Sequence, residues 1–362
     1  MSLQLKRGTT SKMIKIGLNG LGRIGRAITR IVLKSMDCQL NVINEMDPDL
    51  SNAAYLLNYD SIYGRFSEKA SADEQRNALI CNGRVIPVYS SANTEHVPWE
   101  RHDIDVLIDA TGVKANVMAA PRLLGKGIPK IIITHSPDEV DTTIILGVNE
   151  NEYDPKKHHV ISSSICDASA IAPVLFEINK LWVIENCFVT TLHPWLSYQN
   201  LLDGTVSSVS SPGHYWKDYS LGRSSIMNLI PKDTTAAKAV LKVLTELKGK
   251  IEAISFRVPT SIVSASDMTI LVKDKTSAEE INSHFKRLSE EKKDIFELTE
   301  ECLVSIDHQG TNKSAIIDSV RTKVLNERMI KMVVWYDNEW GYSNKVVDIA
   351  RLITKKPGDN HG

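Results

Sequence analysis

The 362-residue sequence has little of what would assign it to a special class of protein. Its five cysteines are scattered and form no CxxC pair, which argues against a disulfide framework and a zinc site, so we expect no metal. No apolar run reaches the roughly 18 residues that span a bilayer. The formal net charge is −1, and nothing suggests binding to nucleic acid or to a membrane. We therefore expect a soluble protein of a reducing compartment, the cytoplasm.

What the sequence does contain is typical of an ordinary globular protein with two domains. Hydrophobic residues make up 42% and charged residues 24% of the chain, which is long enough to bury a sizeable core. Residues 1–12 carry three cations and no apolar core. We interpret them as an N-terminal extension rather than a secretory signal.

The first strong motif is a glycine-rich turn. A short apolar strand, Met13 to Asn19, runs into a G-x-G-x-x-G formed by Gly20, Gly22 and Gly25, and an amphipathic helix follows. In a dinucleotide site the first glycine permits the tight turn, the second lets a pyrophosphate approach the backbone, and the third lets the helix pack on the strand. The alternative is a glycine turn that only packs.

An acidic residue after the second strand supports the dinucleotide interpretation. The strand Leu40 to Ile43 ends at Asn44 and Glu45, and a carboxylate about 20 residues after the glycines accepts hydrogen bonds from ribose hydroxyls. Such a carboxylate would repel a 2′-phosphate, so the sequence favours NAD over NADP.

The next strands alternate with helices. Asp105 to Asp109 and Lys130 to Thr134 read as strands that flank a helix, which predicts an α/β fold with a doubly wound parallel sheet. Ligands bind at the carboxyl ends of such strands, so Thr111 and Thr134 should face the cofactor. The stretch from Phe66 to Trp99 is hairpin-like and should be an insertion or a sheet edge.

Cys166 is a candidate nucleophile. It follows a strand-like run and a serine cluster and opens a helical stretch, and because serine is a preferred N-cap, we expect it at a helix N-terminus. Backbone N–H groups and the helix dipole favour a thiolate there. The alternative is an inert packing cysteine.

Several motifs together resemble the phosphorylating glyceraldehyde-3-phosphate dehydrogenase family, from about Met13 to Ile353. The resemblance implies a Rossmann NAD-binding domain over residues 13–165, completed by a C-terminal helix over 341–356, and a catalytic domain over 166–336. It also implies a homotetramer. The motifs that carry it are Ile14–Arg26, Tyr59–Ser61 with Gly64–Phe66, Ala110–Val113, Gly147–Asn149, Ile230–Pro231 with Ala236–Val240, Phe256–Thr260 and Trp335–Ser343.

The resemblance also assigns roles to single residues. Cys166 matches the family nucleophile and His193 matches its base. Arg23 and Ile24 match the pyrophosphate contacts, and Asn338 matches the residue that orients the nicotinamide carboxamide. Glu45, named above, replaces the usual aspartate.

These residues would run an aldehyde oxidation. The Cys166 thiolate attacks the carbonyl, and His193, with a pKa near 7, removes the hydroxyl proton as hydride leaves for the nicotinamide, so that a thioester forms. Arg257 is the natural clamp for a substrate phosphate. Alone, His193 could be a structural histidine and Arg257 a surface cation in an ion pair.

The chain departs from the family around the nucleophile. Ile165 and Asp167 replace the Ser and Thr that normally help to bind inorganic phosphate, and an ionised Asp167 should raise the pKa of Cys166. Asp167 is equally explained as an acid that suits the first turn of a helix. Leu196 falls where the family has a phosphate-binding Thr, and Thr234 and Thr235 replace its Thr-Gly pair.

A further departure is a longer segment over residues 194–231, which is rich in Ser and Gly. Long irregular loops of this kind are usually functional or mobile.

Three functions fit the sequence. The first is NAD-dependent oxidation of glyceraldehyde 3-phosphate with phosphate as the acceptor, which gives 1,3-bisphosphoglycerate in glycolysis or gluconeogenesis. The second is the same oxidation of another phosphorylated aldehyde, such as erythrose 4-phosphate, with hydrolysis of the thioester. The third is a non-catalytic NAD-binding protein, against which the retained Cys166 and His193 argue.

Overall fold

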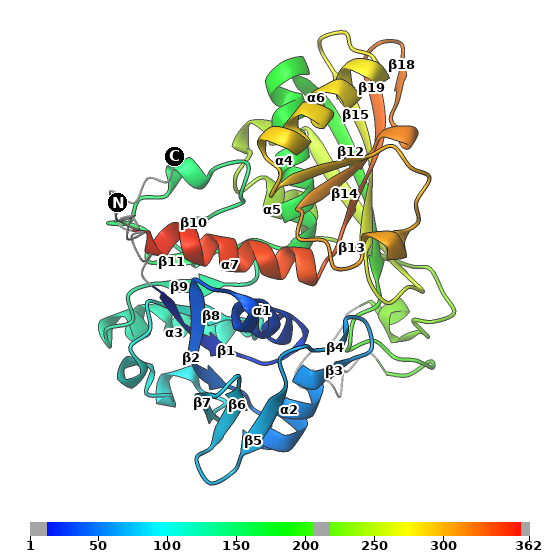
Figure 1. The fold of residues 1–362 in the computed structure, drawn as a ribbon. Helices are drawn as coiled ribbons and strands as arrows, with labels where there is room; N and C mark the ends of the chain where they lie inside the picture. The colour runs from blue at the N-terminus through cyan, green and yellow to red at the C-terminus, as the bar shows by residue number, and fades with distance from the viewer. Residues whose placement is uncertain (1–12, 206–217, 356–362) are drawn as a thin grey trace, which may run out of the picture.

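The computed structural model describes residues 13–205 and 218–355, and two sheets build the two halves of the molecule (Figure 1). The first sheet has nine strands. All its pairs are parallel except those of the last three strands, so the predicted parallel α/β sheet is confirmed. In spatial order its strands are β10 (Thr142–Thr143), β11 (Val160–Ser162), β9 (Ile131–Ile133), β8 (Val106–Asp109), β1 (Ile14–Asn19), β2 (Cys38–Asn44), β7 (Arg84–Tyr89), β6 (Ala78–Cys81) and β5 (Ala70–Asp73).

Helices cover both faces of this sheet, so its central strands bury apolar side chains on both faces. Along β8, Val106 and Ile108 pack in one core and Leu107 packs in the other, as the two-residue period of a strand requires. The helices of the first core are α1 (Arg23–Lys34), α2 (Leu50–Asn58) and α7 (Trp340–Thr354), and that of the second is α3 (Lys114–Gly125).

The C-terminal helix α7 returns to this first half of the chain. It packs against α1, and in Figure 1 it lies in red between the two halves. Tyr342 and Val346 are among its buried residues in the first core. Residues 356–362, into which the expected helix runs, lie outside the described part.

The sheet ends in an antiparallel edge. The stretch from Phe66 to Trp99 supplies β5, β6 and β7, so its interpretation as a sheet edge is confirmed. Asn82 and Gly83 join β6 to β7 with φ of 51° and 73°, the left-handed backbone of a tight hairpin turn. A separate short hairpin pairs β3 (Tyr59–Asp60) with β4 (Gly64–Arg65).

The second sheet builds the other half of the molecule. It carries its helices on one face, where the core residues of α4 pack on the middle strands. The helices are α4 (Cys166–Trp182), α5 (Ala236–Val240) and α6 (Ala278–Glu291). In spatial order the strands are β13 (Ile230–Asp233), β14 (Ile251–Val258), β12 (Ile184–Pro194), β15 (Ser264–Val272), β19 (Met329–Tyr336), β17 (Ala315–Asp318) and β16 (Phe296–Thr299), with β18 (Lys323–Leu325) beside β19.

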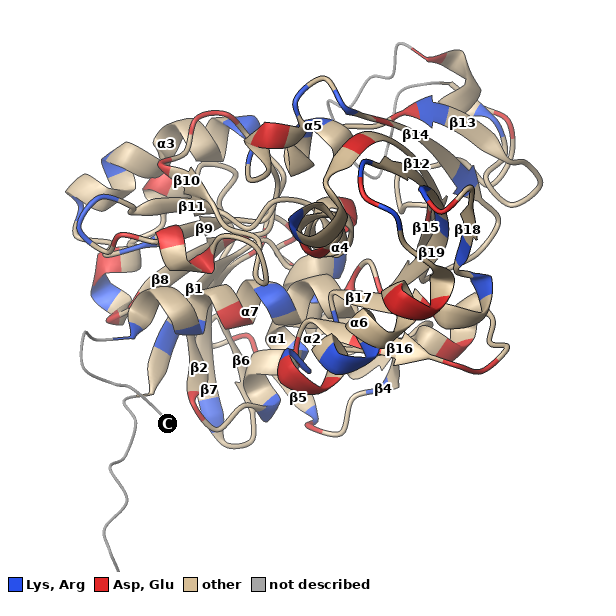
Figure 2. Ribbon diagram, turned by 90° about the horizontal axis from the view of Figure 1, so that it is seen from above, with Lys and Arg blue, Asp and Glu red and all other residues tan. Residues whose placement is uncertain are grey.

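Two expectations fall on residues that are not described. The N-terminal extension, residues 1–12, lies wholly outside the described part, as do residues 206–217 of the long segment 194–231. In the described part, no helix has the length and apolar character needed to cross a bilayer. Figure 2 shows Lys and Arg interspersed with Asp and Glu over both halves.

Candidate active site

A buried polar network holds together the carboxyl ends of the central strands. Asn19, which ends β1, donates from Nδ2 to Asp109 Oδ2 at 2.7 Å, and Asn44 of β2 donates to Asn19 Oδ1 at 2.7 Å. All three are at most 3% exposed, and burial raises the pKa of Asp109. The network fixes the strand ends from which the glycine turn and the loop with Thr111 begin.

The glycine turn has the geometry that the motif predicts. Gly20 has φ of 94°, and a Cβ on Gly25 would lie 2.0 Å from the backbone oxygen of Gly20, so helix and turn pack too closely for any side chain. A Cβ on Gly22 would meet nothing within 4 Å, which leaves open space beside the turn. Helix α1 begins at Arg23 without a side-chain cap. Its first N–H groups are therefore available to a phosphate.

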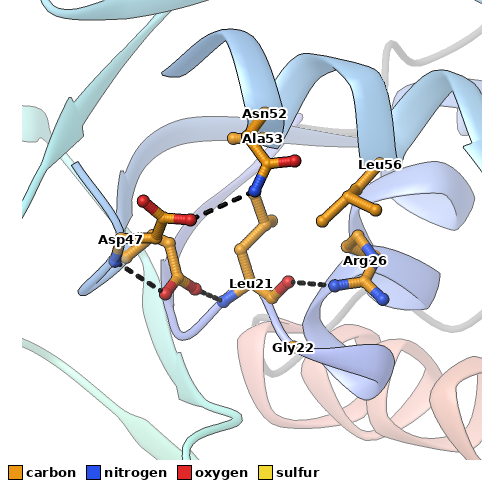
Figure 3. Close-up of a pocket in the computed structure, with 8 residues that line it drawn as sticks. Leu21, Gly22, Arg26, Asp47, Asn52, Ala53 and Leu56 are labelled. Carbon is orange, nitrogen blue, oxygen red and sulfur yellow. Dashed lines mark hydrogen bonds between the residues drawn. The ribbon is translucent and has the colours of Figure 1, made fainter. Parts of the chain in front are cut away.

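A cavity of about 230 Å³ adjoins this turn (Figure 3). Glu45 lines it and accepts a hydrogen bond from the backbone N–H of Leu21 at 2.5 Å, while its other oxygen accepts from the N–H of Asp47 at 3.2 Å. Arg26 also lines the cavity and donates to the backbone oxygen of Leu21. The carboxylates of Glu45 and Asp47 suit ribose hydroxyls and oppose a 2′-phosphate.

Arg23 and Ile24 occupy the first turn of α1, where the pyrophosphate contacts were expected. The Arg23 guanidinium, however, forms ion pairs with Asp60 at 2.6 Å and with Glu339. These partners were not anticipated from the sequence. The guanidinium thus ties α1 to the start of α7, and the group that Arg23 offers to a phosphate is its backbone N–H.

Thr111 and Thr134 lie at neighbouring strand ends, as expected. The Thr111 hydroxyl donates to Asp109 Oδ1 at 2.7 Å and accepts from Asn116 Nδ2 at 2.8 Å. The Thr134 backbone N–H donates to the Asp109 backbone oxygen at 3.0 Å. Both residues therefore shape the loop edge that borders the turn.

The side chain of Asn338 suits a hydrogen bond to the carboxamide of a nicotinamide. It is 4% exposed, and in the described part of the chain no donor reaches its Oδ1. A buried carbonyl without a donor is costly, and a carboxamide N–H would supply one. Asp337 builds the turn that holds Asn338, because its carboxylate accepts from Tyr63 Oη at 2.8 Å and from three backbone N–H groups, those of Glu339, Trp340 and Gly310.

The loop before the nucleophile is fastened by the C-terminal helix. Tyr342 Oη lies 2.8 Å from Ser163 Oγ and donates to the backbone oxygen of Ser164 at 3.0 Å. Ser164 has φ of 60°, a left-handed backbone that a non-glycine residue adopts only when its surroundings hold it there. Helix α4 then begins at Cys166, as expected, although its N-cap is Ile165, which has no capping side chain, and not a serine.

Cys166 and His193 meet between the two halves. His193 lies near the end of β12, is 5% exposed, and places Nε2 3.8 Å from Cys166 Sγ. Its Nδ1 lies 2.8 Å from the backbone oxygen of Pro194, an acceptor. The proton therefore belongs on Nδ1, and the Nε2 lone pair faces the sulfur. This is the orientation that a general base requires.

The protonation states differ from the sequence-based expectation. Burial raises the pKa of Cys166 well above its usual value, and the Asp167 carboxylate raises it further, which outweighs the helix terminus. Burial also lowers the pKa of His193 to about 4, so the expected value near 7 was wrong. At neutral pH the pair is a thiol beside a neutral imidazole, which is free to accept the proton of the thiol.

Asp167 lies against the nucleophile. Its Oδ1 is 3.6 Å from Cys166 Sγ and accepts a hydrogen bond from Tyr336 Oη at 2.8 Å. Asp167 is 7% exposed and Tyr336 is 2% exposed. Tyr336 was not anticipated as a site residue, although it belongs to the family motif near the C-terminus. The ligand atoms of Cys166, Asp167 and His193 lie within 4.8 Å of one another, a spacing that would also suit a metal ion, although none was expected.

Two cations share the sheet face of the catalytic base. In the register of β12 and β14, Arg257 lies beside His193, and Lys232 on β13 lies beside Ser255. Arg257 is 6% exposed, and among the described residues no carboxylate pairs with it, which removes the ion-pair alternative from this part of the chain. Burial and Arg257 lower the pKa of Lys232, while Asp167 raises it. Lys232, which sequence reasoning missed, adds a second positive charge to this face of the sheet.

The remaining expected phosphate ligands are less available. Ile165 packs against the core of the second half and offers no donor. Leu196 bonds through its backbone N–H to Gln199 Oε1 at 3.0 Å, and its side chain is apolar. Thr234 accepts the N–H of Ala236 at the start of α5, and Thr235 is the exposed N-cap of that helix. Ile165 and Leu196 therefore give an incoming phosphate no side-chain donor, whereas the hydroxyls of Thr234 and Thr235 can still donate.

Comparison with known proteins identifies two family domains. Residues 14–117 match the model described as glyceraldehyde 3-phosphate dehydrogenase, NAD binding domain, and residues 165–338 match the model of its C-terminal domain. The second match begins one residue before Cys166 and ends at Asn338.

Curated relatives match over nearly the whole chain. "Glyceraldehyde-3-phosphate dehydrogenase 1" of Bacillus cereus is 36% identical over 345 residues, 95% of this chain and 99% of the relative. "Glyceraldehyde-3-phosphate dehydrogenase" of Geobacillus stearothermophilus is 37% identical over 344 residues, with the same shares. "Glyceraldehyde-3-phosphate dehydrogenase 1" of Kluyveromyces marxianus is 36% identical over 342 residues, 94% of this chain and 100% of the relative.

Proposed function

The chain belongs to the glyceraldehyde-3-phosphate dehydrogenase family, and we propose that it oxidises glyceraldehyde 3-phosphate through a thioester on Cys166. It is an NAD-dependent oxidoreductase, and its cofactor is NAD. The observation that carries the proposal is the approach of His193 Nε2 to Cys166 Sγ at 3.8 Å, beside Asn338 with its unpaired Oδ1.

The residues of the site divide the work. As Cys166 Sγ attacks the aldehyde carbon, His193 Nε2 takes the thiol proton and returns it to the carbonyl oxygen, which gives a thiohemiacetal. His193 then removes the proton of that hydroxyl while the C–H bond breaks and a thioester forms. NAD, when bound, supplies the acceptor for the hydride. Because the pKa of His193 is about 4, its imidazole is unprotonated throughout the neutral pH range and can accept a proton.

The pair of cations supports a phosphorylated substrate. Arg257 carries a buried Nε without a partner in the described part of the chain, and its Nη2 lies 3.5 Å from Tyr198 Oη. Together with Lys232 it offers two positive charges on the face of His193. A phosphate on the far end of a short aldehyde would be held there while its carbonyl meets Cys166.

The family name gives the first candidate for the whole reaction. With inorganic phosphate as the acyl acceptor, the product is 1,3-bisphosphoglycerate, and the role is in glycolysis or gluconeogenesis in the cytoplasm. Erythrose 4-phosphate, the alternative expected from the sequence, carries a phosphate as well, so the apolar Leu196 does not distinguish the two aldehydes and the assay must. A homotetramer is part of the proposal, and the mass in solution should then be that of four 40.3 kDa chains.

A panel of aldehydes tests the proposal. NADH formation from NAD is measured with glyceraldehyde 3-phosphate, erythrose 4-phosphate and unphosphorylated glyceraldehyde, each with and without inorganic phosphate. Glyceraldehyde 3-phosphate should give the highest kcat/KM. Cys166→Ser should abolish turnover, and His193→Asn should slow it by roughly 10²–10⁴. If no aldehyde reduces NAD faster than with Cys166→Ser, the proposal is wrong and a non-catalytic NAD-binding role takes its place.

A further inference from the structure

We propose that Asp167 is a catalytic residue that activates a water molecule, so that the thioester on Cys166 is cleaved by hydrolysis and the product is a free carboxylic acid. The inference rests on the proposed thioester and concerns the step after it. It keeps the proposed oxidation and replaces inorganic phosphate, the acceptor in the first candidate reaction, with water.

The carboxylate is held at the reacting atom. Asp167 Oδ1 is 3.6 Å from Cys166 Sγ, and the hydrogen bond from Tyr336 Oη fixes it there. Among the described residues, no donor reaches Oδ2, so half of the carboxylate remains able to accept a proton from water. Because Oδ1 of the same carboxylate lies 3.6 Å from Sγ, a water that donates to Oδ2 would stand beside an acyl group carried on the sulfur.

The same position is unfavourable for inorganic phosphate. An incoming phosphate would meet the negative charge of Asp167 in a site where both residues flanking Cys166 lack a donor. The Thr234 hydroxyl accepts an N–H at the start of α5 and keeps its own proton, so the donors left at the expected acceptor-phosphate positions are the hydroxyls of Thr234 and Thr235. The nearby cations, Arg257 and Lys232, are the groups that hold the phosphate of the substrate itself. Water needs none of these contacts, and it has a base beside it.

The step balances without an added oxidant or reductant. The water oxygen forms a bond to the thioester carbon while one water proton passes to Asp167. The tetrahedral adduct collapses as the C–S bond breaks, and the sulfur takes the proton back from Asp167, which restores the Cys166 thiol. The products are the carboxylic acid and the free enzyme.

Acceptor experiments on the wild-type enzyme test this directly. With glyceraldehyde 3-phosphate and NAD, steady-state NADH formation should continue without phosphate and change less than twofold when phosphate is added. In water enriched in oxygen-18 and after equilibration of the aldehyde with its hydrate, the acid should carry two labelled oxygens, one from that exchange and one from hydrolysis of the thioester. Acyl phosphate, trapped with hydroxylamine, should be a minor product. A steady state that requires phosphate and yields acyl phosphate would overturn the inference and leave the proposed oxidation intact.

Two variants at position 167 separate the base from the rest of the site. Asp167→Asn keeps the shape, so the first burst of one NADH per Cys166 should remain, while the steady-state rate falls by roughly 10²–10⁴ as a general base is lost. Asp167→Thr restores the family residue, and phosphate should then accelerate its turnover. A full burst with unchanged hydrolysis in Asp167→Asn contradicts the inference. If neither the wild type nor Asp167→Asn releases even one NADH per Cys166, the thioester itself is refuted, and with it the proposed function.

Discussion

Removing the charge of Asp167 should make Cys166 a more reactive nucleophile. Burial and the carboxylate of Asp167 raise the pKa of the thiol, and Arg257 lowers it. The other groups around the sulfur are His193, whose pKa of about 4 leaves it neutral, and Tyr336, whose pKa is raised well above its usual value. Asp167→Asn therefore removes the one negative charge among these groups and should lower the pKa of Cys166.

The size of the effect follows from the 3.6 Å separation of the two side chains. Two unit charges at that distance interact by about 1.2 kcal/mol at the dielectric constant of water and by about 4.6 kcal/mol at an effective value of 20. Since about 1.4 kcal/mol is a factor of ten, these limits correspond to about 7-fold and about 2,000-fold more thiolate at pH 7. A thiolate of lower pKa is also less nucleophilic, which cancels nearly half of the gain on a logarithmic scale. Alkylation at pH 7 should therefore be about 3- to 70-fold faster in Asp167→Asn.

Iodoacetamide labelling followed by peptide mass spectrometry measures this rate at Cys166. Cys302 is exposed and provides an internal control in the same tube, because its rate should not change with the substitution. In the wild type, labelling of Cys166 should still rise with pH above the usual thiol pKa, since that of Cys166 is raised. If Cys166 in Asp167→Asn reacts at the wild-type rate or more slowly while Cys302 is unchanged, the electrostatic reasoning is wrong.

Other predictions concern the glycine turn, the hydrogen bond from Tyr342 to the loop before Cys166, and the proposed phosphate site. Gly25→Ala should prevent stable folding, because its Cβ has no room. Gly22→Ala should have the thermal unfolding midpoint of the wild type, because its Cβ meets nothing, and an NAD titration should show weaker binding. Tyr342→Phe leaves the Ser164 carbonyl without its side-chain donor, which costs about 2 kcal/mol and lowers Tm by roughly 2–3 °C in a chain of 362 residues; an unchanged Tm would contradict this. Arg257→Ala should reduce kcat/KM for the phosphorylated aldehyde by roughly 10- to 150-fold and that for glyceraldehyde by much less, the smaller loss reflecting the effect of Arg257 on the pKa of Cys166; equal losses would show that Arg257 does not bind the phosphate.

The sequence predicted the parts of the fold that rest on local patterns. A strand, a glycine turn and a helix in direct succession fix their own geometry, so the turn from Gly20 to Gly25 and the carboxylate of Glu45 beside it could be placed without coordinates. The start of a helix at Cys166 was likewise a local inference. Its N-cap was wrong because backbone geometry at Ser164, held from α7, decides where the helix begins.

The catalytic surroundings could not be predicted in the same way, because they depend on strand register and burial. Lys232 reaches the site through two strand pairings between distant segments. β13 pairs with β14 so that Lys232 lies beside Ser255, and β14 in turn pairs with β12, which carries His193. The pKa of His193 depends on how much water the finished site excludes, which no residue pattern reports. Tyr336 stood in a recognised motif, yet its partner became visible only when β19 was placed against α4.

The role of Asp167 depends both on its position in the sequence, at the start of a helix, and on the contacts that the fold gives it. From the sequence it was either an acid suited to a helix start or a residue hostile to phosphate, and the contacts with Cys166 and Tyr336 give it a third role, as a base. The roles differ in the sign of their effects. Loss of a merely structural acid would disturb the site and slow both acylation and deacylation. If the Asp167 carboxylate both raises the pKa of the thiol and activates water, its removal should speed alkylation of Cys166 and slow release of the acyl group. Only the third role predicts these opposite changes in one variant.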